Sequence, residues 1–201
     1  MSDQNGWLKL LGENPNHSQW YIDRFRSMAE AGADLAGEAR FVDAMLARGS
    51  KVLDAGCGTG RLGGYLAAAG HEVVGVDLDP ALIAEAKANH PDAQWLVGDL
   101  SELDLPGRFD VIVSAGNVMT FVAPSTRVEI LRRCGRHLAD GGRLVVGFGA
   151  GRGYPFDDFL ADATSAGLTA DLLLGTWDLR PFTADSDFLI AVLRTPGTTE
   201  Q

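Results

Sequence analysis

The stretch VLDAGCGTGRLGGYLA, from Val52 to Ala67, decides the fold, because its glycines fit two different cofactor-binding loops. Glycines at 56, 58 and 60 form the pattern G-x-G-x-G. Read from Gly58 through Gly63, the same stretch gives G-x-G-x-x-G, the fingerprint of dinucleotide-binding proteins. The two patterns would place different parts of the loop against a ligand. The position at which the preceding strand ends distinguishes between them.

In a dinucleotide-binding unit the first glycine turns the chain where the first strand stops. Here the apolar run ends at Asp54 and Ala55, which makes Gly56 the turning residue. The dinucleotide frame therefore begins two residues late, and the G-x-G-x-G frame is favoured. Gly63, which only the dinucleotide frame requires, is expected to accept alanine with little effect.

Composition limits the kind of partner. A chain of 201 residues with 46% hydrophobic content fits one domain. A formal net charge of -10 argues against a nucleic-acid partner, and no apolar run approaches the ~18 residues of a membrane span. Two cysteines give no disulfide framework, and the N-terminus has no signal-peptide pattern. We therefore expect a cytoplasmic protein with a small-molecule substrate; composition does not indicate its oligomeric state.

Apolar runs of strand character alternate with amphipathic stretches of helical length. The expected parallel strands are 51–55, 72–77, 94–97, 109–115 and 143–148. The helices expected between them are 60–69, 80–90 and 125–139. After a further helix at 156–166, strands at 168–177 and 187–194 follow, with a connection too short for a crossover helix. The sequence therefore predicts an α/β fold with a Rossmann-like, doubly wound, seven-stranded sheet that is mostly parallel and ends in an antiparallel hairpin.

Two amphipathic segments, 18–31 and 38–47, precede the first strand. The predicted organisation is an N-terminal helical cap or lid over 1–49, a binding core over 50–195 and a disordered tail over 196–201. A lid would touch the ligand, whereas a structural cap would only cover the core, and the sequence leaves both readings open.

Three carboxylates follow the first three strands in turn, at Asp54, Asp77 and Asp99. Since the carboxyl ends of parallel strands meet at one edge of a sheet, these side chains should surround a single crevice. A pyrophosphate would be repelled there. S-adenosylmethionine carries a sulfonium, an ammonium and one carboxylate, and its net positive charge suits an acidic crevice.

Five segments in order resemble the motifs of the class I S-adenosylmethionine-dependent methyltransferases: VLDAGCGTG, VVGVDLDP, WLVGDL, FDVIVSAGNVM and LADGGRLVVGF. The resemblance begins near Lys51. It implies that Asp54 contacts the ammonium, that Asp77 accepts both ribose hydroxyls, and that the remaining contacts to the methionine and adenine moieties come from Gly56, Gly58, Gly60, Leu78, Asp99 and Leu100. Asn117 is expected to belong to the cofactor site as well. Either Tyr21 or Arg26 is expected to reach the methionine carboxylate by a hydrogen bond or an ion pair.

The sequence says less about the methyl acceptor than about the cofactor, because methyl transfer needs mainly alignment and exclusion of water and therefore few specific side chains. The Asn/Asp-Pro-Pro-aromatic motif of certain nitrogen methyltransferases is missing at 114–117, and no carboxylate cluster suggests a metal. A small organic acceptor is therefore expected. Candidates to orient or deprotonate it are His17, Tyr21 and Tyr154, and candidate substrate contacts are Arg152, Tyr154 and Arg180.

Two other functions remain open at this level. The chain could be a noncatalytic S-adenosylmethionine-binding module that acts through a partner. It could also be an NAD-dependent oxidoreductase that uses the second glycine frame.

Overall fold

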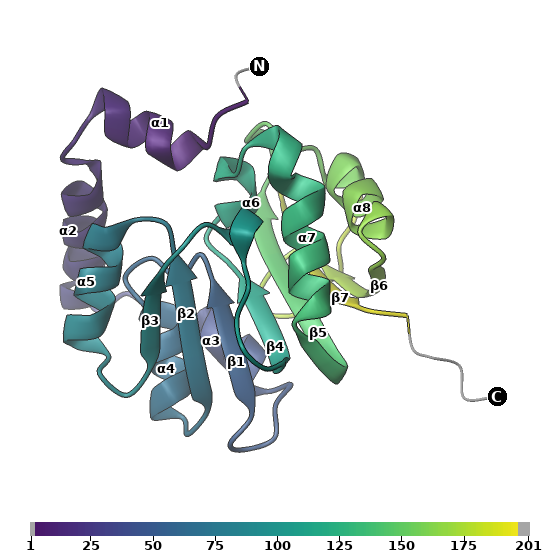
Figure 1. Cartoon of the computed structure of the whole chain (residues 1–201), viewed down its shortest axis with the longest axis horizontal. Helices are drawn as coiled ribbons and strands as arrows, with labels where there is room; N and C mark the ends of the chain where they lie inside the picture. Colours follow the sequence, from purple (N-terminus) through teal and green to yellow (C-terminus); the bar gives the residue numbers. More distant parts are fainter. Residues whose placement is uncertain (1–2, 197–201) are drawn as a thin grey trace.

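The computed structural model describes residues 3–196, so the tail expected at 196–201 lies, apart from residue 196, outside the described residues. Within this range seven strands form one sheet in the order β3-β2-β1-β4-β5-β7-β6 (Figure 1). The strands are β1 Lys51–Ala55, β2 Glu72–Asp77, β3 Gln94–Val97, β4 Phe109–Ser114, β5 Leu138–Gly149, β6 Thr169–Leu174 and β7 Phe188–Arg194. Strands β1 to β5 pair in parallel, while β7 lies antiparallel between β5 and β6. The predicted α/β sheet and its antiparallel hairpin are confirmed.

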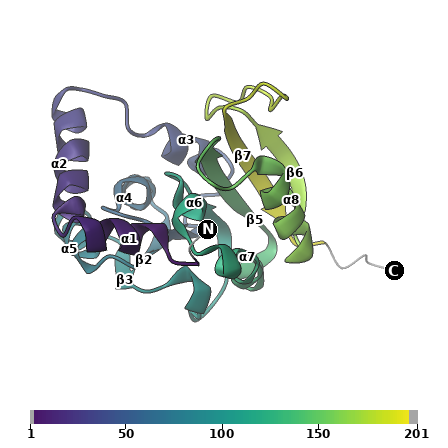
Figure 2. The same ribbon diagram turned by 90° about the horizontal axis from the view of Figure 1, so that it is seen from above.

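Helices cover both faces of the sheet because the central strands β1, β4 and β5 and the antiparallel strand β7 bury apolar side chains on both sides. The helices are α1 Gly6–Glu13, α2 His17–Glu30, α3 Gly37–Asp43, α4 Arg61–Ala68, α5 Pro80–Asn89, α6 Val118–Phe121, α7 Arg127–Arg136 and α8 Phe156–Ser165, with short 3-10 turns at Leu100–Glu102 and Pro124–Thr126. Residues of α3 and α4 pack into the core on one face, and residues of α7 and α8 pack into the core on the other. Figure 2 shows these layers from above.

Strand β5 begins at Leu138, five residues before its expected start, and α7 ends at Arg136 rather than continuing to residue 139. The early part of β5 pairs Leu138 with Phe109, and a register shift follows before the regular pairing from Arg143 onwards. Gly142 sits at this irregularity, where an added Cβ would lie 2.8 Å from the carbonyl oxygen of Phe109. Because the sequence there is polar and rich in glycine, its pattern did not indicate the start of a strand.

The N-terminal segment divides into two parts. Helix α3 belongs to the core, since Ala39 and Val42 are fully buried. Helix α1 instead lies at the carboxyl end of the sheet, above β2 and β3, and α2 runs beside α5 (Figures 1 and 2). Helix α1 was not expected from the sequence, and it is the element that closes the crevice described next.

Candidate functional site

The glycine loop between β1 and α4 uses the G-x-G-x-G frame. Strand β1 ends at Ala55, and Gly56 follows at φ 84°, a left-handed conformation that glycine adopts without strain. The Gly56 N–H donates to the carbonyl oxygen of Val76 at 2.8 Å, which fastens the turn to β2. The Gly58 N–H donates to Oδ2 of Asp77 at 2.9 Å, so the loop and the end of β2 form one unit.

Gly63 is not the free position that the sequence suggested. Its N–H donates to Oδ2 of Asp54 at 2.9 Å, and an added Cβ would lie 2.9 Å from the Trp95 ring and 3.0 Å from Val73. The expectation that alanine leaves cofactor binding nearly unchanged stays a prediction, but α4 packs against the sheet at this glycine, so alanine there should lower stability. Gly60 has a similar packing role, since its Cβ position is filled by Trp95 and Ala86, and it does not line the cavity.

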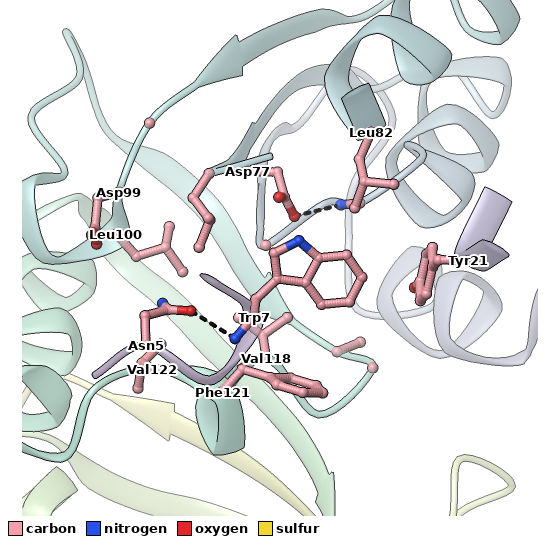
Figure 3. Close-up of a pocket in the computed structure, with 16 residues that line it drawn as sticks. Asn5, Trp7, Tyr21, Asp77, Leu82, Asp99, Leu100, Val118, Phe121 and Val122 are labelled. Carbon is pink, nitrogen blue, oxygen red and sulfur yellow. Dashed lines mark hydrogen bonds between the residues drawn. The ribbon is translucent and has the colours of Figure 1, made fainter. Parts of the chain in front are cut away.

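A cavity opens beside the loop at the carboxyl ends of the strands (Figure 3). About 660 Å³ of space not filled by protein atoms lies in and around it, the open solvent at its mouth included. Its lining includes the polar groups of Gly56, Gly58, Asp77 and Asp99. The apolar part of the lining, which we call the apolar slot, consists of Trp7, Leu78, Leu82, Leu100, Val118, Phe121 and Val122.

The three expected carboxylates differ in environment. Asp54 is 3% exposed, and burial raises its pKa to about 7. Asp77 accepts from the N–H groups of Gly58 and Asp79, and burial raises its pKa as well. Asp99 caps the turn after β3 by accepting from the Ser101 N–H. Asp77 and Asp99 line the main cavity, while Asp54 lines a smaller adjoining pocket that also reaches Gly56.

Helix α1 supplies a part of the site that sequence reasoning missed. Asn5 caps the helix by accepting from the Trp7 N–H at 2.9 Å, and the Trp7 ring lies in the middle of the cavity wall in Figure 3. The indole Nε1 donates to Oδ2 of Asp79 at 2.8 Å, and the same oxygen accepts from the Ser18 hydroxyl at 2.5 Å. Asp79 is 2% exposed and also caps α5 by accepting from the Ala81 N–H. This buried carboxylate therefore fastens α1 and α2 to the strand end that carries Asp77.

Tyr21 stands where the cavity meets a second hollow. It borders the main cavity, the small pocket at Asp54, and a groove between α2 and the ends of β4 and β5. We call this hollow the aromatic groove; its walls are Trp7, Leu10, His17, Trp20, Tyr21, Arg24, Phe25, Met28, Asp34, Leu35, Glu38, Arg61, Gly116, Asn117, Phe121 and Arg152. Burial raises the pKa of the Tyr21 hydroxyl to about 12, so the hydroxyl is a hydrogen-bond donor at neutral pH.

The structure brings most of the remaining predicted residues to these two hollows. Leu78 and Leu100 line the cavity, and His17 and Arg152 line the aromatic groove. Asn117 borders the groove rather than the cavity, and its Oδ1 accepts from the Gly149 N–H at 2.8 Å. Its side chain therefore joins the loop after β4 to the end of β5.

Three predicted residues lie elsewhere. Tyr154 is 1% exposed and packs against Phe148, and its hydroxyl donates to Asp162 at 2.7 Å, so it is a core residue. Arg26 points away from the cavity and pairs with Glu85 at 3.0 Å. Arg180 is exposed and pairs with Asp178 in the loop after β6, outside both hollows. These positions correct the expectation that the three side chains face a ligand.

Arg61 is a further residue that the sequence did not single out. It starts α4, borders both the small pocket and the aromatic groove, and forms an ion pair with Glu38 at 3.0 Å. Its position depends on how α3 packs against α4, for which the sequence carries no local signal. The apolar spacing of Trp7, Leu10 and Leu11 after Asn5 could, in contrast, have indicated α1.

The residues present fit an adenosyl group that bears a charged tail. The carboxylate of Asp77 faces the cavity and keeps acceptor capacity beyond its two backbone bonds, as vicinal hydroxyls require. The apolar slot suits a flat base. A Cβ built on Gly58 would meet nothing nearer than Tyr21 at 3.6 Å, so the backbone there leaves room for a ligand. Asp54 and Tyr21 border the small pocket. There the carboxylate of Asp54 suits the ammonium of a methionine tail, and the hydroxyl of Tyr21 suits its carboxylate.

The fold and this site define a nucleoside-binding α/β protein of the methyltransferase type, and comparisons with known proteins agree. A family model described as a methyltransferase domain matches residues 52–142. A TehB-like SAM-dependent methyltransferase of Corynebacterium glutamicum is 52% identical, with a TM-score of 0.88 over 91% of this chain and 100% of that one. The chain belongs to the class I S-adenosylmethionine-dependent methyltransferases.

Two curated relatives match over shorter stretches. A probable S-adenosylmethionine-dependent methyltransferase of Mycolicibacterium smegmatis is 31% identical over 62% of this chain and 50% of its own length. An 18S rRNA (guanine-N(7))-methyltransferase of Bos taurus is 36% identical over 39% of this chain and 29% of its own length. This chain thus spans half or less of the length of these relatives.

Between residues 3 and 196, no helix combines the length and apolar character needed to cross a membrane. The same residues hold no cluster of three or more His, Cys, Asp or Glu side chains able to bind a metal ion.

Proposed function

We propose that this protein transfers the methyl group of S-adenosylmethionine to a small-molecule acceptor held in the aromatic groove. The observation that carries this proposal is the shared border of the two hollows. The cofactor cavity and the groove meet at Tyr21 and Gly116, so a group at the loop end of the cavity faces a molecule in the groove.

When bound, S-adenosylmethionine would supply an electrophilic methyl carbon; the acceptor would use a lone pair to form the new bond, the electrons of the broken carbon–sulfur bond would stay on sulfur, and an acceptor O–H or N–H would release its proton. The chain itself positions the partners and excludes water. Trp7 and Phe121 close the cavity from above, and both also border the groove. Enclosure of this kind strengthens alignment and electrostatic contacts at the reacting atoms.

His17 and Tyr21 divide the remaining roles. The Tyr21 hydroxyl stays protonated because burial raises its pKa to about 12, so it orients groups as a donor. The His17 imidazole lies in the groove and stacks on Trp20 at 5.3 Å. Imidazole is the side chain most often used for proton transfer near neutral pH, and His17 is our candidate to take the proton of the acceptor.

A small acceptor suits this chain better than RNA. The chain has a formal net charge of -10, which disfavours binding to a negatively charged phosphate backbone. The bovine relative named for 18S rRNA matches only 39% of this chain and 29% of its own length.

Calorimetry and a labelled-methyl assay test the proposal together. The protein should bind S-adenosylmethionine and S-adenosylhomocysteine but not NAD, and label should pass from S-adenosylmethionine to a fraction of low-molecular-weight metabolites. Cofactor binding without transfer to any metabolite pool would support a noncatalytic binding module. Binding of NAD alone would restore the dinucleotide reading.

A further inference from the structure

The aromatic groove has a chemical character of its own, distinct from that of the cofactor cavity. Its rings come mainly from α2, and they include His17, Trp20 and Phe25. Trp20 is 51% exposed although it is a large apolar residue. Exposed aromatic surface next to a reaction site is typical of a surface that a ligand covers. The walls therefore suit a flat, aromatic partner.

The charged side chains of the groove leave a net positive charge there. Its two carboxylates are neutralised by neighbours: Asp34 pairs with Arg40 at 2.6 Å, and Glu38 pairs with Arg61 at 3.0 Å. Arg24 and Arg152 also line the groove, and within the described residues no carboxylate forms an ion pair with either. The Arg24 guanidinium instead lies over the Trp20 ring, 5.6 Å from its centre. The groove thus presents two uncompensated cations in a chain whose net charge is -10.

The two arginines come from separate parts of the fold. Arg24 belongs to α2, and Arg152 lies in the loop after β5. The junction with the cofactor cavity, at Tyr21 and Gly116, belongs to the same groove. A molecule that pairs its anionic group with these arginines can therefore keep its ring against α2 and its nucleophile at the junction.

We propose that the methyl acceptor is an aromatic small molecule that carries a carboxylate, recognised by Arg24 and Arg152 and held by contact with the aromatic side chains of α2 that line the groove. This inference rests on the proposed methyl transfer. It adds the substrate class. The arginine side chains can bind a carboxylate in bidentate fashion, and the rings supply contact area and cation–π support.

The test uses the full chain saturated with S-adenosylhomocysteine. The probes are one-ring and two-ring aromatic acids such as 4-hydroxybenzoate, each with its neutral methyl ester and its cationic aminomethyl analogue. Calorimetry should show the acids binding at least about tenfold more tightly than the esters, with the amines weakest. Absence of binding by every acid, equal affinity for the esters, or preference for the amines would overturn the proposal.

Two variants and a matched control locate the effect. Arg24→Gln and Arg152→Gln should each weaken binding of the acids by about fivefold or more and leave the affinity for the esters and for S-adenosylhomocysteine unchanged. Arg132→Gln removes the same charge from α7, outside the groove, and should change none of these values. Equal behaviour of all three variants would overturn the assignment of Arg24 and Arg152.

The same samples separate this inference from the proposed function. If S-adenosylhomocysteine does not bind, the proposed function itself fails. If it binds and labelled methyl passes only to neutral or cationic metabolites, methyl transfer stands and the aromatic acid is wrong.

Discussion

At the scale of single residues, Asp77 lines the cavity and accepts hydrogen bonds from the N–H of Gly58 in the glycine loop and from the N–H of Asp79. Asp77→Ala should weaken binding of S-adenosylhomocysteine by about 2–4 kcal/mol, because two charge-assisted bonds to the ribose are lost together. Asp77→Asn retains an acceptor for the loop and separates loss of ligand contacts from loss of loop order. Calorimetry measures the affinity, and circular dichroism checks folding. Native affinity in a folded alanine variant would contradict the ribose assignment.

The packing of Gly63 gives a second prediction. Gly63→Ala should lower the free energy of unfolding by about 1–3 kcal/mol, because the new methyl meets a buried Trp95 ring and the Asp54 carboxylate. Gly12→Ala is the matched control, since Gly12 is also helical but its Cβ position is open. That control should be neutral or slightly stabilising. Denaturant unfolding compares the two, and equal stability would contradict the packing argument.

Tyr21 and Arg26 were both candidates for the methionine carboxylate, and the structure separates them. Tyr21 borders the pocket at Asp54, whereas Arg26 pairs with Glu85 outside it. Tyr21→Phe should weaken binding of S-adenosylhomocysteine by about 1–2 kcal/mol through loss of one hydrogen bond to a charged group. Arg26→Ala should bind it with native affinity in the same titration. The reverse order of effects would reassign the carboxylate to Arg26.

At the scale of elements, α1 covers the cavity and depends on Asp79 for its attachment. Trp7→Phe keeps a ring in the wall but removes the indole N–H that reaches Asp79. Amide hydrogen exchange in residues 6–13 should therefore become faster in this variant, and addition of S-adenosylhomocysteine to the native protein should slow it. Helix α2 should respond less, because Ser18 and Ile22 are already buried. Ligand-independent exchange of α1 would make it a fixed cap rather than a lid.

The elements that the sequence predicted well are those with an uninterrupted local signal. Strands β1 to β4 are short apolar runs between helices, and Asp79 with Pro80 starts α5 as its cap and first residue. The predicted site failed where side-chain direction depends on distant packing. Tyr154 follows a strand end in sequence, yet its ring packs in the core against the rings of Phe148 and Phe159. The place of Trp7 in the cavity wall likewise depends on distant partners: its N–H donates to a carboxylate seventy-two positions away, and its ring packs against Ile22 and Leu82.

At the scale of the whole molecule, the charge distribution links ligand choice to stability. Asp54, Asp77 and Asp99 gather at the carboxyl ends of three adjacent strands, where a ligand with net positive charge is favoured. The aromatic groove next to them has the opposite character through Arg24 and Arg152. A cationic cofactor and an anionic acceptor can therefore occupy neighbouring hollows, each beside charges of the sign that it needs, within a chain that is acidic as a whole.

The buried carboxyl of Asp54 gives the last prediction, on the pH dependence of stability in the absence of ligand. Its pKa is raised from 3.8 to about 7 in the folded state, so between these values the folded chain holds a proton that the unfolded chain has released. The contribution of this group is therefore fully present below about pH 4 and is lost as pH rises towards 7, by up to about 1.4 kcal/mol per pH unit. Asp54→Asn retains an acceptor for the Gly63 N–H but cannot ionise, so its stability advantage over the native chain should grow from pH 4 to pH 7. Asp92→Asn, at an exposed position, should show no such growth. Urea unfolding at four pH values measures the difference, and parallel curves for the native and Asp54→Asn chains would show that the carboxyl is already ionised in the folded protein.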